Sequence, residues 1–280
     1  MAESIPSEAA PAPSAVARLG RSALEAAGLG RGLWLTLTAA LRTARAPGAS
    51  ARAVCREVCV RQIFYTSVQA LGLLSVVALF IGATLVLQTE ILSGAVHREV
   101  VGRVLVAVVM RELAPLITAV LVAGRSGTAI ATELGVMHVG REVLGLSSLG
   151  IDPPRLLVWP RLVASVISLP VLTVYFGAVA VAGGCLAALA LGAHGLGDLQ
   201  MGLTEALVPA DLPLFLVKTL GLGCIVGLLC SHFGLQVGTS PTDVPRRASQ
   251  AVVSTLLACV IYNTVVTVAF YWWLGSPLAR

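Results

Sequence analysis

The sequence alternates between long apolar segments and shorter polar ones. Each long apolar segment exceeds the roughly 20 residues that a helix needs to cross about 30 Å of hydrocarbon. The pattern therefore predicts an all-α, polytopic membrane protein with about five membrane-spanning helices. The predicted spans cover residues 64–89, 101–124, 161–192, 212–237 and 250–274.

The first 50 residues differ from the rest of the chain. Residues 1–16 are rich in Ala, Pro and Ser, a composition typical of disordered segments. Within residues 17–45, apolar residues recur at helical spacing between arginines, which predicts an amphipathic helix lying in the cytoplasmic interface. A soluble helix packed on a partner is the alternative. We therefore divide the chain into a disordered start with an interfacial helix, residues 1–50, and a membrane domain, residues 51–280.

The distribution of arginine predicts how the spans are oriented. The first 63 residues hold eight Arg, residues 125–161 hold four, and residues 239–249 hold two. Residues 193–211 hold no Lys or Arg and three acidic residues, and residues 90–103 are mixed. Because positively charged loops remain in the cytoplasm, the N-terminus is expected there and the C-terminus on the outer side. The chain is thus expected to be a multi-pass protein of an inner membrane.

Composition agrees with this assignment and excludes other classes. Hydrophobic residues make up 57% of the chain and charged residues 12%, about half the share of a soluble domain. The net charge of +5 comes from arginines at the ends of apolar segments, so we expect them to meet lipid headgroups and not nucleic acid. Of the six cysteines, Cys55 and Cys59 share a helix face, but no further ligand accompanies them, so no metal site is expected.

The sequence lacks the motifs of common enzymes. It contains no GxxxxGK[ST] phosphate loop, no HExxH and no GxSxG. We expect no catalytic residue and no cofactor, and any ATP hydrolysis would have to occur in a partner chain.

A charged pair, Arg111-Glu112, lies near the middle of the second predicted span. Charges at this depth are costly, and they usually face a bundle interior or a water-filled cavity. Pro115 follows and is expected to free a backbone carbonyl. A polar contact in a substrate pathway is the functional interpretation, and an ion network between helices is the structural alternative.

Smaller signals concern the last two spans. Lys218 is expected to extend towards the outer interface, as lysines near helix ends do. Asn263 is expected to hydrogen-bond across helices, and Gly223 and Gly227 have the GxxxG spacing that allows close helix packing.

The polar connection at residues 125–160 is expected to contain a short helix over residues 137–149. Its apolar residues recur at helical spacing, and Pro153 and Pro154 follow soon after. A short cytoplasmic helix between two spans suits docking to a partner, although a simple amphipathic surface helix would show the same pattern.

Several segments of this region resemble a known family. They are Arg111-Glu112-Leu113-Ala114-Pro115, AGRSGTAIATELGVM (residues 123–137), LSSLGIDPPRLLVWPRLVA (residues 146–164) and SLPVLT (residues 168–173). Together they resemble the MlaE (YrbE) permeases of ABC transporters, and the resemblance runs from about residue 55 to residue 274. Asn263 stands where that family often has Asp.

The resemblance implies a homodimeric permease that moves phospholipids between the inner and outer membranes and so maintains outer-membrane lipid asymmetry. It also implies a cytoplasmic ABC ATPase dimer, a periplasmic MCE-domain protein and, in some systems, a STAS-domain subunit. Arg111, Glu112 and Leu113 would then lie near the lipid cavity. The helix at 137–149 would be the coupling helix. The residues expected to contact the ATPase are Arg141, Glu142 and Leu146.

Two other functions fit part of the pattern. A secondary transporter would use Glu112 or Glu133 for proton coupling, but the odd number of predicted spans and the lack of inverted repeats argue against it. A membrane scaffold that transports nothing is the second alternative. Association with an ATPase, proton dependence and lipid in the purified protein would distinguish the three.

Overall fold

The computed structural model describes residues 49–93, 106–150, 153–190, 211–238 and 240–273, together with Gly32 and Thr38. Within these ranges every regular element is helical, which confirms the predicted all-α class. The disordered start and the interfacial helix predicted for residues 1–50 lie almost wholly outside the described residues, so they stay predictions.

The described ranges contain ten helical segments. They are α2 (Ala49–Ser93), η1 (Val106–Leu113), α4 (Ala114–Val122), η2 (Ala123–Gly127), α5 (Thr128–Val139), α6 (Glu142–Ser148), η3 (Pro154–Val158), α7 (Trp159–Ala190), α9 (Asp211–Leu235) and α10 (Asp243–Trp273). The three η segments are π-helical, a rare form that often marks functional sites.

Five helical stretches are long and apolar enough to cross a membrane, as predicted. They cover Arg56–Gln88, Val108–Val139, Leu156–Ala190, Leu212–Leu235 and Asp243–Trp272. The second stretch is built from η1, α4, η2 and α5, and α6 is the short helix that follows it.

The second span ends later than the sequence predicted. Residues 125–139 were expected in a polar connection, but they continue as helix through η2 and α5. Ser126, Ile130 and Leu134 are buried, so one face of this helix belongs to the bundle. Its polar residues lie on another face, where Arg125 and Glu133 have hydrogen-bonding and ionic partners. Polar residues on one face therefore do not end the helix.

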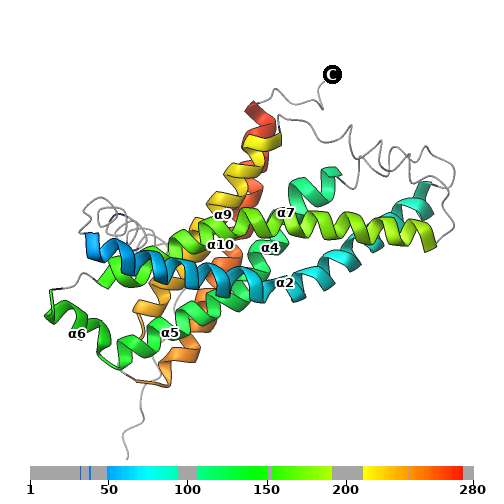
Figure 1. Cartoon of the computed structure of the whole chain (residues 1–280). Helices are drawn as coiled ribbons and strands as arrows, with labels where there is room; N and C mark the ends of the chain where they lie inside the picture. Colours follow the sequence, from blue (N-terminus) through cyan, green and yellow to red (C-terminus); the bar gives the residue numbers. More distant parts are fainter. Residues whose placement is uncertain are drawn as a thin grey trace, which may run out of the picture.

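Helices α2 and α7 form one pair, α9 and α10 form another, and the two pairs cross (Figure 1). Helix α2 lies along α7, α7 contacts α9, and α9 contacts α10. Glycines allow the backbones to approach: a Cβ on Gly82 would overlap the backbone of Ala180 in α7. A Cβ on Gly223 would lie 2.7 Å from the Cα of Val166, and one on Gly227 2.9 Å from the Cα of Leu162. The close packing predicted for Gly223 and Gly227 is thus confirmed.

The chain turns at Gly140 and Arg141 between α5 and α6. Arg141 has a φ of 58°, in the left-handed region, and α6 begins at the next residue, Glu142. The short helix predicted over residues 137–149 therefore begins five residues later in the structure, because residues 137–139 belong to α5. We call this side of the bundle the α6 end; the C-terminus of α9 and the N-terminus of α10 also lie there (Figure 1).

Candidate functional site

A half-buried carboxylate links three of the spans. The Glu112 carboxylate lies 2.8 Å from Lys218 Nζ, and Asn263 Nδ2 donates a hydrogen bond to its other oxygen at 3.1 Å. The Thr267 hydroxyl lies within 3.2 Å of both carboxylate oxygens. We call these four residues, together with the Arg111 carbonyl, the Glu112 network. It joins η1 to α9 and α10 in the middle of the membrane domain.

Lys218 has an environment that the sequence did not predict. It is fully buried instead of extending to the outer interface. Besides Glu112, its ammonium donates a hydrogen bond to the Arg111 carbonyl at 2.9 Å. In an α-helix that carbonyl would accept from residue 115, which is Pro115 and has no N–H. Lys218 thus binds a carbonyl one helical turn before Pro115, the proline expected to disturb this part of the helix.

The two neighbours of Glu112 in η1 have different surroundings. Arg111 and Leu113 are half-buried, and consecutive residues of a helix point in different directions. The structure therefore brings Glu112 together with Lys218 and Asn263, while the Arg111 side chain leaves the helix on another side. The hydrogen bond across helices predicted for Asn263 is confirmed; its Oδ1 has no partner among the described residues.

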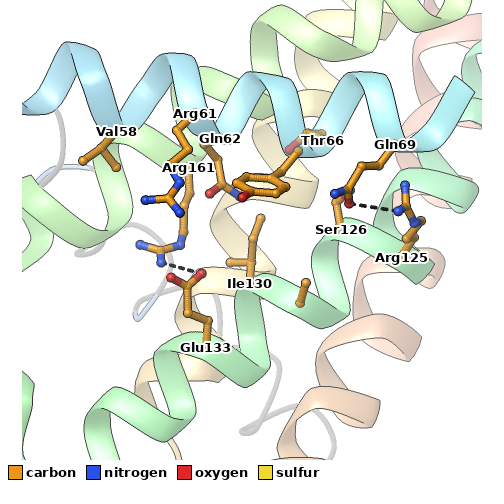
Figure 2. Close-up of a pocket in the computed structure, with 12 residues that line it drawn as sticks. Val58, Arg61, Gln62, Thr66, Gln69, Arg125, Ser126, Ile130, Glu133 and Arg161 are labelled. Atoms are coloured by element: carbon orange, nitrogen blue, oxygen red, sulfur yellow. Dashed lines mark hydrogen bonds and ion pairs between the residues drawn. The ribbon is translucent and has the colours of Figure 1, made fainter.

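A second polar site lies towards the α6 end, between α2, the η2–α5 segment and α7 (Figure 2). It is a cavity of about 610 Å³, which we call the arginine cavity. Its lining residues are Val58, Arg61, Gln62, Tyr65, Thr66, Gln69, Arg125, Ser126, Ala129, Ile130, Glu133 and Arg161. The lining contains three guanidinium groups and one carboxylate, a formal balance of +2.

Each arginine of the cavity is held differently. Arg161 is buried and forms an ion pair with Glu133 at 2.8 Å, and it also donates to the Leu157 carbonyl at 2.6 Å. Arg125 Nη2 donates to Gln69 Oε1 at 2.9 Å, which Figure 2 shows at the opposite side of the cavity. The Arg61 guanidinium lies 5.7 Å from the centre of the Tyr65 ring. Arg61 and Arg125 therefore contact neutral side chains, whereas Arg161 is paired with a carboxylate.

The residues expected to contact an ATPase lie in and beside α6. Arg141 and Glu142 are exposed, and Leu146 is half-buried against the core. Leu144 and Leu149 are exposed apolar residues of the same segment. An apolar groove lies next to α6, between the end of α5 and the start of α10. Its lining residues are Val136, Val139, Gly140, Pro241, Val244 and Pro245. The structure thus places a charged and apolar surface at the α6 end.

Comparison with known proteins fits this arrangement of helices. The sequence profile of the family described as Permease MlaE matches residues 59–269. The chain belongs to the MlaE permease family. The matched region contains the Glu112 network and all of the arginine cavity except Val58.

Named relatives of the chain come from bacteria and from a chloroplast. A probable ABC transporter permease protein of Rickettsia conorii is 29% identical, and the alignment covers 76% of this chain and 82% of the relative. The chloroplastic protein TRIGALACTOSYLDIACYLGLYCEROL 1 of Arabidopsis thaliana is 30% identical over 78% of this chain, which spans 63% of that relative. The intermembrane phospholipid transport system permease protein MlaE of Haemophilus influenzae is 37% identical. That alignment covers 45% of this chain and 49% of the Haemophilus protein.

Sequence reasoning did not find the arginine cavity. Arg61, Arg125 and Arg161 were interpreted only as signals of how the spans are oriented. A usable signal was present, because Arg125, Ala129 and Glu133 are spaced by four residues and so share one helix face. For metals, no three His, Cys, Asp or Glu side chains gather anywhere in the described ranges.

Proposed function

We propose that this member of the MlaE family is the permease subunit of an ABC transporter that moves phospholipids between the inner and outer membranes. The observation that carries the proposal is the family match over residues 59–269. The names of two relatives support it: the Rickettsia protein is a probable ABC transporter permease, and the Haemophilus protein is an intermembrane phospholipid transport system permease. The protein would lie in the inner membrane with its α6 end and N-terminus in the cytoplasm and its C-terminus in the periplasm.

The residues of η1 would serve the lipid cavity in different ways. Arg111 is half-buried on a span and carries a guanidinium that can bind a phosphate group with two hydrogen bonds. Leu113, also half-buried, would contact an acyl chain. Glu112 would hold η1 in position through Lys218 and Asn263. The π-helical form of η1 supports a functional role for this segment.

The energy for transport would come from a cytoplasmic ABC ATPase dimer that docks on α6. Arg141 and Glu142 would form charged contacts with it, and Leu146 would transmit the movement because it packs against the core. Exposed Leu144 supports this proposal, since an apolar side chain on a short helix outside the bilayer suits a protein contact. ATP binding would move α6, close the lipid cavity and expel the lipid.

The other partners that we propose are inferred from the family alone. A second copy of the chain would complete the cavity, and α10 presents exposed apolar residues, among them Val253, Leu257 and Ile261, to lipid or to that copy. A periplasmic MCE-domain protein would receive or deliver the lipid, and a STAS-domain subunit would join the ATPase. In this proposal the permease itself catalyses no reaction.

Replacement of Arg111 tests the proposed lipid contact. In the complex purified with its ATPase, Arg111→Ala should abolish most ATP-dependent movement of a fluorescent phospholipid between vesicles, while assembly of the complex is unchanged. Arg111→Lys keeps the charge and should retain part of the activity, because it loses only the two-pronged geometry.

Normal lipid movement by the Arg111→Ala complex would show that Arg111 does not contact the lipid. Transport that requires a proton gradient and no ATPase would contradict the proposed function itself, and it would favour proton coupling through Glu112 or Glu133.

A further inference from the structure

We propose that the arginine cavity is a separate binding site for a phosphate ester, and that its ligand is the headgroup of a phospholipid in the leaflet at the α6 end. The proposal rests on the proposed function, because a lipid permease must meet its lipid in a leaflet. It concerns a site different from the one assigned to Arg111. Arg111 and Arg125 are fourteen residues apart on the same span, roughly 20 Å at 1.5 Å per residue.

The charge of the cavity indicates an anionic ligand. Its one carboxylate, Glu133, already pairs with Arg161. Among the described residues, Arg61 lies beside the Tyr65 ring and Arg125 beside the Gln69 amide, and no described carboxylate pairs with either. Guanidinium groups bind phosphate oxygens through paired hydrogen bonds, and arginine is the side chain best suited to this geometry. A bound phosphate diester would offset one of the two excess charges.

Buried polar groups of the lining lack partners, which indicates that the cavity is built for a ligand. Arg161 is 4% exposed, and its Nε has no hydrogen-bond partner among the described residues. Thr66 is 1% exposed, and its hydroxyl also has none. Buried donors are nearly always satisfied in folded proteins. Both groups are donors and phosphate oxygens are acceptors, so a ligand that reaches them after a small movement of the side chains would satisfy the charge and the hydrogen bonds together.

The size and position of the cavity favour a lipid headgroup over a free phosphate ion. Its volume of about 610 Å³ is in the range of sites for small organic ligands and is far larger than a phosphate ion requires. Along α2 it extends from Val58 to Gln69, about 16 Å at 1.5 Å per residue. The first candidate span begins at Arg56, so the cavity reaches inwards from the membrane surface. Val58 and Ile130 supply apolar wall for the carbons next to a headgroup.

Substitution of Glu133 should change anion binding in the direction opposite to loss of an arginine. Its carboxylate is 56% exposed and competes with any anion for Arg161. Removing its charge raises the formal balance of the lining from +2 to +3. Glu133→Gln should therefore strengthen anion binding, whereas loss of an arginine should weaken it. A role of these residues in folding alone would not give effects of opposite sign on binding.

The test measures binding to the full-length purified protein in detergent, without ATP, by titration with short-chain dihexanoyl-phosphatidylglycerol. Arg125→Gln should raise the Kd about tenfold, the size expected for loss of one charged hydrogen bond. Thr66→Val should raise it by a smaller factor, and Glu133→Gln should lower it. Arg56→Gln is the control, since Arg56 is exposed on α2 and does not line the cavity.

Inorganic phosphate forms the second arm of the titration. It should bind much more weakly than the short-chain lipid; equal or tighter binding would identify the ligand as free phosphate and overturn the lipid proposal. An unchanged Kd in both Arg125→Gln and Thr66→Val, with thermal unfolding showing both proteins folded, would refute the site. Because this assay uses no ATPase, a failed transport proposal would leave its outcome unaffected.

Discussion

In the Glu112 network, both carboxylate oxygens have donors within 3.2 Å, supplied by side chains from two other spans. In the arginine cavity, the buried Nε of Arg161 and the Thr66 hydroxyl have no partner among the described residues. Both sites place charge within membrane-spanning helices, where unpaired charge is costly. Asn263 Oδ1 of the Glu112 network also lacks a partner, but the charged groups of that network, Glu112 and Lys218, are paired with each other. The arginine cavity instead has two guanidinium groups that no described carboxylate pairs with, besides its two unpaired donors. The difference indicates that the Glu112 network holds helices together, and that the arginine cavity is incomplete without a ligand.

The two sites also differ in how they connect the spans. The Glu112 network joins η1 to α9 and α10. The arginine cavity lies between α2, the η2–α5 segment and α7, which are the first three spans. The second span is common to both, with Glu112 and Arg125 thirteen residues apart. A movement of α6, which follows this span directly, would therefore act on both sites through one helix.

The largest effect is expected from Lys218→Met, which tests whether the Glu112 network is structural. It leaves the Glu112 charge without its cation, and breaking a buried pair in this way costs about 3–5 kcal/mol. The lower end applies, because the Glu112 side chain is 34% exposed. Thermal unfolding of the purified protein should show a large loss of stability. The double variant Lys218→Met with Glu112→Gln should recover most of it, because no unpaired charge remains.

An unfolding temperature of Lys218→Met equal to that of the unchanged protein would contradict this prediction. The polar side chains of the Glu112 network would then resemble those of the arginine cavity, which we propose bind a ligand and do not stabilise the fold.

A smaller effect is expected from Gly82→Ala, which acts on α2, one wall of the arginine cavity. The added methyl group would overlap the Ala180 backbone in α7, and a backbone cannot move aside by changing rotamer. We expect a loss of about 2 kcal/mol, typical of overpacking, measured by thermal unfolding. Gly72→Ala is the matched control on the same helix, because nothing lies within 4 Å of its added Cβ. It should be neutral or stabilising, since Ala favours helix over Gly.

Equal stability of Gly82→Ala and Gly72→Ala would show that α2 and α7 separate easily. The arginine cavity would then be adjustable in width, unlike the tightly paired Glu112 network.

Local patterns in the sequence were enough to predict much of the fold. The apolar segments predicted five spans because their length is set by the membrane itself. Gly223 and Gly227 predicted close packing because their spacing alone places them on one face.

The parts that could not be predicted depend on partners far apart in the chain. Lys218 is buried because Glu112, 106 residues earlier, supplies a carboxylate. Arg125, where the second span was expected to end, donates a hydrogen bond to Gln69, 56 residues earlier, and the helix continues beyond it. A single sequence shows each of these polar residues without its partner. For Lys218 an exposed position is then the reasonable expectation, and the packing of the helices reverses it.

The smallest effect, and the most direct comparison of the two sites, comes from one substitution made in each. Thr267→Val removes a hydroxyl that bonds to Glu112 and to the Asn263 carbonyl, so it should cost about 1 kcal/mol of stability. Thr66→Val removes a buried hydroxyl with no partner among the described residues, so stability should be unchanged or slightly higher. Thermal unfolding of both variants without added lipid measures the difference. If Thr66→Val costs as much as Thr267→Val, the Thr66 hydroxyl has a structural partner, and the distinction between a paired network and an incomplete cavity fails at that residue.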